Sequence, residues 1–398
     1  MISIRSITYS LSHEITDDEL SLVNKIAIQW EKKSSLIHTQ RICTYPLTEP
    51  LSNDIIDKLS FLCDSSSIRW FNIAIDPWKS NKVDELFDFS QSVLREYNRS
   101  FINVLTVRDG CLDFDYIRKS IELVKSNSCL SSNGRDNFRL GCSFNVSENG
   151  AFFPFTFSGG SIGFSIALEM TKEINKICDE NYDLSLTELQ QKIISELSLQ
   201  IRDIHKLAEE IAIQFGVAFH GFDFSLAPEI DKSGSVIHLL NRIGVFNYGK
   251  TGTFFATAYY TNILKALGKS FPNCGFSGIM YSLLEDLELC MINNEKGVTL
   301  EEIISLSTMC GCGVDMVPVP RDISCDEMIS IFLDVYAIST RLQKPLGIRI
   351  LPIPYARKNI IKYTNFSEDA DFIANTRVVQ TDGNVLDECG IFKFISLK

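Results

Sequence analysis

Apolar and polar residues follow two periods along this chain, one typical of strands and the other typical of helices. Short apolar or alternating runs predict strands at 2–9, 41–45, 70–75, 101–107, 138–146, 217–226, 314–319 and 346–353. Amphipathic stretches separate these runs. Because strand-like and helix-like segments alternate from end to end, the pattern predicts a mixed α/β fold.

The longest predicted helix spans about 187–215, where apolar residues recur at helical spacing. Ser185 and Glu188 have the spacing of a capping box before it, and Gly216 supplies a stop after it. Two further capping boxes, at 299–302 and 324–327, predict helices toward 309 and 342. The polar stretch 126–137 is the best candidate for a loop or boundary inside one large domain.

Charge and cysteine content limit the kinds of partner and the cellular location that the sequence predicts. The 398 residues include 38 basic and 50 acidic side chains, a net charge of −12, and no basic run that would attract nucleic acid. The apolar stretches are broken by charges, so no membrane span is expected. The 12 cysteines are scattered through the chain, which predicts reduced thiols and a cytoplasmic location. We expect a small-molecule partner, and a homo-oligomer is compatible with the sequence.

The segment 217–228 places a carboxylate and a hydroxyl near a strand end. In a strand, Asp223 and Ser225 share one face, while Phe222 and Phe224 share the other. Strand ends in α/β folds are where sites are built. Two interpretations follow: the pair binds a ligand, or it caps a neighbouring turn.

The segment 244–251 matches the phosphate-loop pattern, including Lys250 and Thr251. A phosphate loop follows a strand, yet the preceding residues 236–243 have helical spacing and the loop interior holds bulky residues. A nucleoside triphosphate site is therefore disfavoured. Thr251, Gly252 and Thr253 still precede a predicted helix, whose start can hold a carboxylate or phosphate.

The segment 273–286 combines a flexible backbone with acidic side chains. Gly275 and Gly278 flank Ser277 and let a ligand approach the backbone closely. Glu285 and Asp286 are expected about two turns into a following helix. These carboxylates either form a solvated helix face or act on a metal or a proton.

Two cysteines, Cys310 and Cys312, are each followed by glycine at a predicted helix-to-strand turn, with Asp315 three residues further on. The remaining cysteines and histidines are too dispersed to complete a zinc site. A helix C-terminus opposes thiolate formation, so the pair is either inert or reacts as neutral thiols.

These segments resemble the domain-of-unknown-function 711 family. The resemblance is carried by residues 4–8, 223–228, 251–253, 275–278 with 285–286, and 310–318. It implies a fold similar to that of pyruvate formate-lyase and ribonucleotide reductase, a ten-stranded α/β barrel of two five-stranded halves with radical chemistry on a central cysteine loop. Glycyl-radical enzymes carry Arg-Val-x-Gly near the C-terminus, whereas Arg377, Val378 and Val379 are followed by Gln380.

The working hypothesis is an enzyme that acts on a small, anionic metabolite inside a barrel. Its expected catalytic groups are Cys310, Cys312, Asp223 and Asp315. Its expected anion-binding residues are Ser225, Thr251, Gly252, Thr253, Gly275, Ser277 and Gly278, with Glu285, Asp286 and Lys250 in secondary positions. The alternatives are a non-catalytic binding or regulatory protein on the same barrel and a phosphate-loop NTPase; the sequence names no metal or cofactor.

Overall fold

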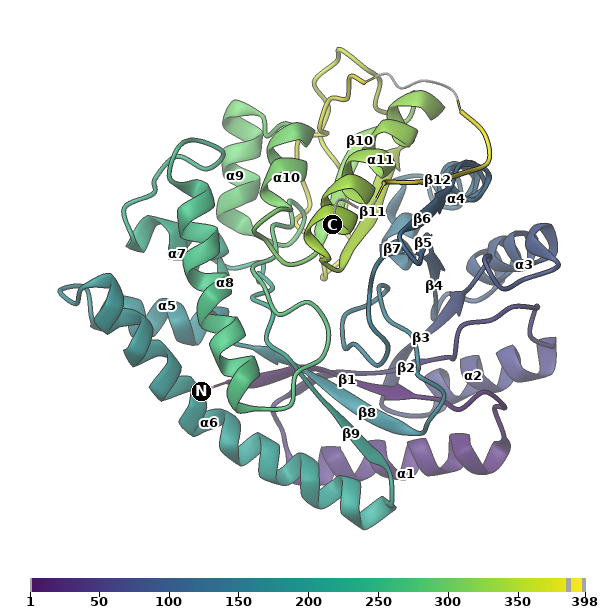
Figure 1. Ribbon diagram of the computed structural model, residues 1–398, viewed down its shortest axis with the longest axis horizontal. Helices are drawn as coiled ribbons and strands as arrows, with labels where there is room; N and C mark the ends of the chain where they lie inside the picture. Colours follow the sequence, from purple (N-terminus) through teal and green to yellow (C-terminus); the bar gives the residue numbers. More distant parts are fainter. Residues whose placement is uncertain (1, 384–387, 396–398) are drawn as a thin grey trace.

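Alternating strands and helices form a large curved sheet with helices on its outside in the computed structural model, which describes residues 2–383 and 388–395 (Figure 1). The strands are β1 Ser3–Ser10, β2 Ile37–Cys43, β3 Ile68–Ile75, β4 Ser100–Leu105, β5 Val107–Arg108, β6 Cys111–Asp113, β7 Leu140–Phe144, β8 Gly163–Glu169, β9 Ala218–Asp223, β10 Gly313–Pro320, β11 Leu346–Ile353 and β12 Ile391–Lys393. Strands β5, β6 and β12 form a separate small sheet. The mixed α/β class predicted from the sequence is confirmed.

The helices between these strands begin and end at clear signals. They are α1 Asp17–Lys33, α2 Asn53–Ser65, α3 Val83–Glu96, α4 Phe114–Asn127, α5 Thr171–Glu180, α6 Leu186–Phe215, α7 Val236–Arg242, α8 Thr253–Ser270, α9 Leu287–Lys296, α10 Leu300–Leu306 and α11 Cys325–Leu342. All three predicted capping boxes form, and Gly216 ends α6 in the left-handed region.

Nine strands of the described chain make up the main sheet, in the order β10-β11-β7-β4-β3-β2-β1-β8-β9. The central five, from β7 to β1, are parallel. The pairs β8-β9 and β10-β11 join them antiparallel on either side. The segment 145–162 connects β7 to β8, while the polar stretch 126–137 runs from the end of α4 toward β7, and a half-barrel boundary there stays a prediction.

This ladder does not close into the ten-stranded barrel that the family resemblance implies, because β9 and β10 remain its edges among the described residues. The bridging segment, residues 273–280, lies between them. It has isolated parallel bridges to Phe222 and Leu226, and its Ile279 carbonyl accepts a hydrogen bond from Gly311 N, just before β10. The positive φ of 49° at Ser277 interrupts the extended backbone that a continuous ladder needs.

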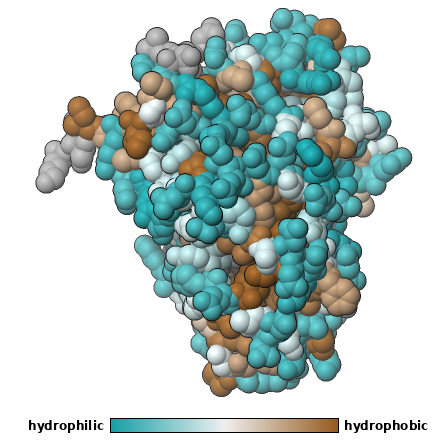
Figure 2. All heavy atoms as spheres, turned by 90° about the vertical axis from the view of Figure 1, so that its right-hand side faces the viewer, coloured by the Kyte–Doolittle hydropathy of each residue, from teal (hydrophilic) through white to brown (hydrophobic). Residues whose placement is uncertain are grey.

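The outer face of the sheet packs on the helices through the apolar stripes that the sequence pattern predicts. Leu189, Ile193 and Leu197 of α6 are buried there, and Trp30 of α1 packs edge-to-face on Phe164 of β8 with ring centroids 5.7 Å apart. The opposite surfaces of the helices are mainly hydrophilic, and Figure 2 shows a band of hydrophobic residues on one side of the molecule. No helix within 2–383 and 388–395 has the length and apolar character needed to cross a membrane.

The inner face of the sheet is polar and holds the inner loop, residues 145–162, which connects β7 to β8. Thr8 Oγ1 of β1 donates to Ala151 O (3.3 Å), and Asn72 Nδ2 of β3 donates to the carbonyls of Pro154 (3.0 Å) and Thr156 (2.8 Å). These bonds satisfy loop carbonyls that would otherwise be buried without partners. The inner loop is therefore fixed by side chains of the surrounding strands.

Candidate functional site

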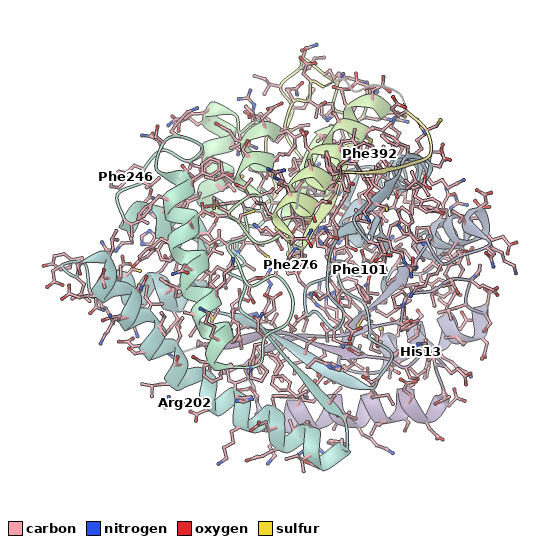
Figure 3. The ribbon with its side chains drawn as sticks, in the orientation of Figure 1. His13, Phe101, Arg202, Phe246, Phe276 and Phe392 are labelled. Carbon is pink, nitrogen blue, oxygen red and sulfur yellow. The ribbon has the colours of Figure 1, made fainter. Side chains whose placement is uncertain are left out.

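A cavity of about 580 Å³ is lined by strands β1, β2, β3, β4, β8, β10 and β11, by the inner loop and by residues 370–372. Its walls carry both charges and aromatic rings. Phe101, near the middle of the molecule in Figure 3, lies on this wall. The charged lining includes four arginines from four strands, Arg5, Arg41, Arg69 and Arg349.

Two of these arginines have a dedicated carboxylate. Arg349 is buried on β11, where its Nε donates to Asp315 Oδ1 (2.6 Å) and its Nη2 to Asp315 Oδ2 (2.9 Å). Burial alone would lower the pKa of Arg349, but Asp315 more than offsets this and the pKa is raised. Arg69 pairs with Asp371 at 2.5 Å in a more exposed position. Both guanidinium charges are therefore balanced.

Arg5 is held by an acidic group at the end of β8. Its Nη1 lies 3.0 Å from Glu169 Oε1, and its Nη2 lies 3.5 Å from Glu285 Oε1. The other oxygen of Glu169 lies 3.3 Å from His38 Nδ1, and this hydrogen bond raises the pKa of His38. The cavity therefore contains a histidine and a carboxylate in position to exchange a proton.

Arg41 differs from the other three because no carboxylate of the described chain pairs with it. Its Nε donates to Thr39 Oγ1 (3.1 Å), and its Cζ lies 5.1 Å from the centre of the Phe153 ring. Burial, together with smaller contributions from the charges of the other three arginines, lowers the pKa of Arg41 to about 9. Part of the cavity is therefore a positively charged pocket whose charge lacks a partner.

Aromatic rings form the wall beside this charge. Phe101 packs edge-to-face on Trp70 (ring centroids 5.4 Å apart) and on Phe138 (5.0 Å), and Phe138 packs on Phe372 (5.4 Å). Rings held this way are rigid and exclude water on one side of the cavity. Such a surface fits an apolar portion of a bound molecule.

Asp223, predicted as a catalytic carboxylate, organises the bridging segment. It accepts hydrogen bonds from Ser225 N (2.8 Å), Ser225 Oγ (2.5 Å), Ser277 N (3.1 Å) and Phe276 N (3.3 Å). Burial raises the pKa of Asp223, although these bonds oppose the rise. A Cβ at Gly275, where φ is 73°, would lie 2.4 Å from Asp223 Oδ2, so only glycine fits this contact.

The bridging segment also packs against the backbone between the two predicted thiols. A Cβ at Gly278 would lie 2.7 Å from Gly311 Cα, which places the backbone between Cys310 and Cys312 directly against the segment. Both cysteines are buried, and burial raises the pKa of the Cys312 thiol well above its usual range. The structure thus assembles Asp223, Ser277 and the thiols around residues 273–280, and none of them lines the cavity.

Glu285 and Asp286 occupy different surroundings from those predicted. They do not lie two turns into a helix, because residues 279–286 are irregular and α9 begins only at Leu287. Glu285 lines the cavity. Asp286 is fully buried and caps α7 and α9, since it accepts from Ser235 Oγ (2.7 Å), Val236 N (2.8 Å) and Leu289 N (3.1 Å).

Asp286 should make stability depend on pH. Burial raises its pKa to about 6, above the usual 3.8, so the folded state binds more protons than the unfolded state between these values. Its contribution to stability therefore falls as the pH rises through this window, by up to about 3 kcal/mol. Urea unfolding between pH 4 and 7 should show that the free energy of unfolding of wild type increases, relative to that of Asp286→Asn, as the pH is lowered. A pH-independent difference between the two proteins would contradict this assignment.

The remaining predicted anion-binding residues lie at the start of α8, away from the cavity. Thr251 and Gly252 end an irregular turn and Thr253 opens the helix; Lys250 Nζ lies 3.4 Å from Glu302 Oε1. The element before this turn is helix α7, not a strand. The turn therefore connects two helices, α7 and α8, whereas a phosphate loop connects a strand to a helix.

The cavity arginines were missed in the sequence because each is an ordinary charge in a different strand. One signal was present: Arg349 interrupts the otherwise apolar run 346–353, and a charge inside a buried strand requires a partner or a site. Arg5 lies in the segment 4–8 that carries the family resemblance, but it was not assigned a role there.

Fold and cavity together define an α/β protein whose curved sheet encloses an inner loop and an arginine-lined cavity. The chain belongs to the family described as Uncharacterised ACR (DUF711), whose model matches residues 3–359. No group of three metal-ligating side chains of the kind that holds an ion occurs in the described part of the chain.

Similar proteins carry the name UPF0210 protein. One from Pyrobaculum arsenaticum is 28% identical over 76% of this chain and 68% of its own length. Others, from Pyrobaculum aerophilum and Methanocaldococcus jannaschii, are 27% and 24% identical over 64% of this chain, which spans only 56% and 57% of their lengths.

Proposed function

We propose that this protein binds a small anionic metabolite in the arginine-lined cavity and acts on it there. The observation that carries the proposal is Arg41, a guanidinium without a carboxylate partner in the described chain, next to three arginines of which each has one. An anion bound to Arg41 would remove the cost of holding this charge near three like charges. The aromatic wall would contact the apolar part of the same molecule.

The cavity also contains groups for chemistry on the bound anion. His38 and Glu169 form a hydrogen-bonded pair on its wall and are the candidates for proton transfer. Thiol and carboxylate chemistry by Cys310, Cys312 and Asp223 stays a prediction for the region around the bridging segment. The alternative, a binding or regulatory protein without catalysis, differs in one observable: it forms no product detectable by mass spectrometry.

A barrel similar to that of pyruvate formate-lyase is part of the same proposal. The support is the bridging segment, whose hydrogen bonds to β9 and to Gly311 put it in the position of a tenth strand. The inner loop enters the enclosed space as the central loop of such a barrel would, but residues 145–162 contain no cysteine. This favours proton transfer over radical chemistry at that loop.

The test is anion binding by wild type and by Arg41→Gln. Calorimetry with phosphate, sulfate and small mono- and dicarboxylates should find an anion that wild type binds, and the substitution should weaken it by about 30-fold or more because a charged contact is lost. The unliganded variant should be at least as stable as wild type, since an unbalanced charge is removed.

The matched control is Arg202→Gln, which removes an exposed arginine from the outer face of α6 (Figure 3). It changes the net charge equally and should leave the affinity unchanged. Equal affinities of Arg41→Gln and wild type for every anion that binds would refute the proposal.

A further inference from the structure

Glu285 is a carboxylate of the cavity that makes few polar contacts with the described chain. Its side chain is 21% exposed and its one ion pair in the described chain is with Arg5 Nη2 at 3.5 Å, longer than an ordinary hydrogen bond. No described side chain or backbone group donates a hydrogen bond to it. By contrast, Asp315 in the same region receives two short bonds from Arg349.

The charge of Arg5 is already balanced without Glu285. Arg5 Nη1 donates to Glu169 Oε1 at 3.0 Å and also contacts the carbonyl of Pro228 at 3.3 Å. Loss of Glu285 would therefore leave Arg5 with a partner. Glu285 is therefore not required to balance the charge of Arg5, and the described side chains around it donate no hydrogen bond to it.

Arg41 and Glu285 face the same cavity and influence one another without forming an ion pair. Both residues line the cavity, no ion pair or hydrogen bond of the described chain joins them, and the negative charge of Glu285 opposes the lowering of the Arg41 pKa. Each is thus a charged group with unused hydrogen-bonding capacity, one a donor and the other an acceptor. Both groups therefore offer this capacity to a molecule in the same cavity.

We infer that the metabolite is a zwitterion, such as an amino acid, whose anionic group binds Arg41 and whose ammonium group binds Glu285. The inference rests on the proposed function, because it specifies the chemistry of the molecule in the same cavity. The ammonium group would supply the donors that Glu285 lacks, and the side group would lie on the aromatic wall formed by Phe101 and Phe138.

The experiment compares three pairs of probes that differ only by an amino group: propanoate with alanine, glutarate with glutamate, and 3-phenylpropanoate with phenylalanine. Calorimetry on the full chain should show that wild type binds the amino member of at least one pair about tenfold or more tightly than its partner. In Glu285→Gln this preference should vanish, because the amide carries no charge to attract the ammonium group. In Arg41→Gln both members should bind weakly.

Glu196→Gln is the matched control, because Lys192, at 2.8 Å on the outside of α6, is the one ion-pair partner of Glu196 among the described residues. It should retain the full preference. If wild type binds the carboxylates through Arg41 but never prefers the amino member, the zwitterion inference fails while the proposed function stands. If no member of any pair binds, the zwitterion inference fails, and the proposed function fails with it when phosphate and sulfate do not bind either.

Discussion

Replacing Asp315 with alanine is expected to lower the free energy of unfolding by about 3–5 kcal/mol. The side chains of Asp315 and Arg349 are 2% and 7% exposed, so Asp315→Ala leaves a guanidinium charge buried with the Phe138 carbonyl (3.1 Å) as its one acceptor in the described chain. Urea or thermal unfolding should show the loss directly.

Two further variants define the cause of this loss. The double variant Asp315→Leu with Arg349→Met replaces the pair by apolar groups of similar size and should recover most of the stability. Asp371→Ala breaks a pair whose side chains are 42% and 41% exposed, and should cost no more than about 1 kcal/mol. If Asp315→Ala and Asp371→Ala lose the same free energy of unfolding, the buried pair of Asp315 and Arg349 does not have the effect on stability that its burial implies.

The second large effect is expected at Phe155 of the inner loop, whose ring lies against two neighbouring strands. A Cβ at Gly347 of β11 would lie 2.5 Å from this ring, and a Cβ at Gly141 of β7 would lie 2.6 Å from it. Phe155 is 1% exposed. Phe155→Ala should therefore cost about 3–5 kcal/mol, and Gly347→Ala about 1–3 kcal/mol through overpacking.

The double variant tests whether these two effects have one origin. In Phe155→Ala the missing ring leaves room for the new methyl group, so Gly347→Ala should cost little in that background. Gly150→Ala is the control, because a Cβ there meets nothing closer than 3.6 Å. Costs that simply add would show that the ring and the glycine do not share the contact.

Local signals along the chain were sufficient for most elements. Ser185, Glu188 and Gly216 defined α6, and the alternation around Phe222 and Phe224 defined β9, because capping and side-chain period act within a few residues. Strand β8 was missed. Its sequence, Gly-Phe-Ser-Ile-Ala-Leu-Glu, alternates large apolar residues with small or polar ones, so the period-2 signal of a strand was present and was overlooked.

The site was harder to predict because it depends on strand order. Arg5, Arg41 and Arg349 come from β1, β2 and β11, and only the sheet topology places them around one cavity. The bridging segment was predicted as a ligand site from its glycines. In the structure those glycines allow close packing, with Gly275 against Asp223 and Gly278 against Gly311, and a ligand site there stays a prediction.

The bridging segment has a consequence for the behaviour of the protein at high concentration. Exposed edge strands offer unpaired amide and carbonyl groups to other chains and promote self-association. Here Leu226 N and O are paired with Gly278 and Met280, and Gly311 N is paired with Ile279, so residues at both borders of the sheet have their backbone groups occupied within the same molecule. The segment therefore protects the edges of the sheet from pairing with strands of other molecules.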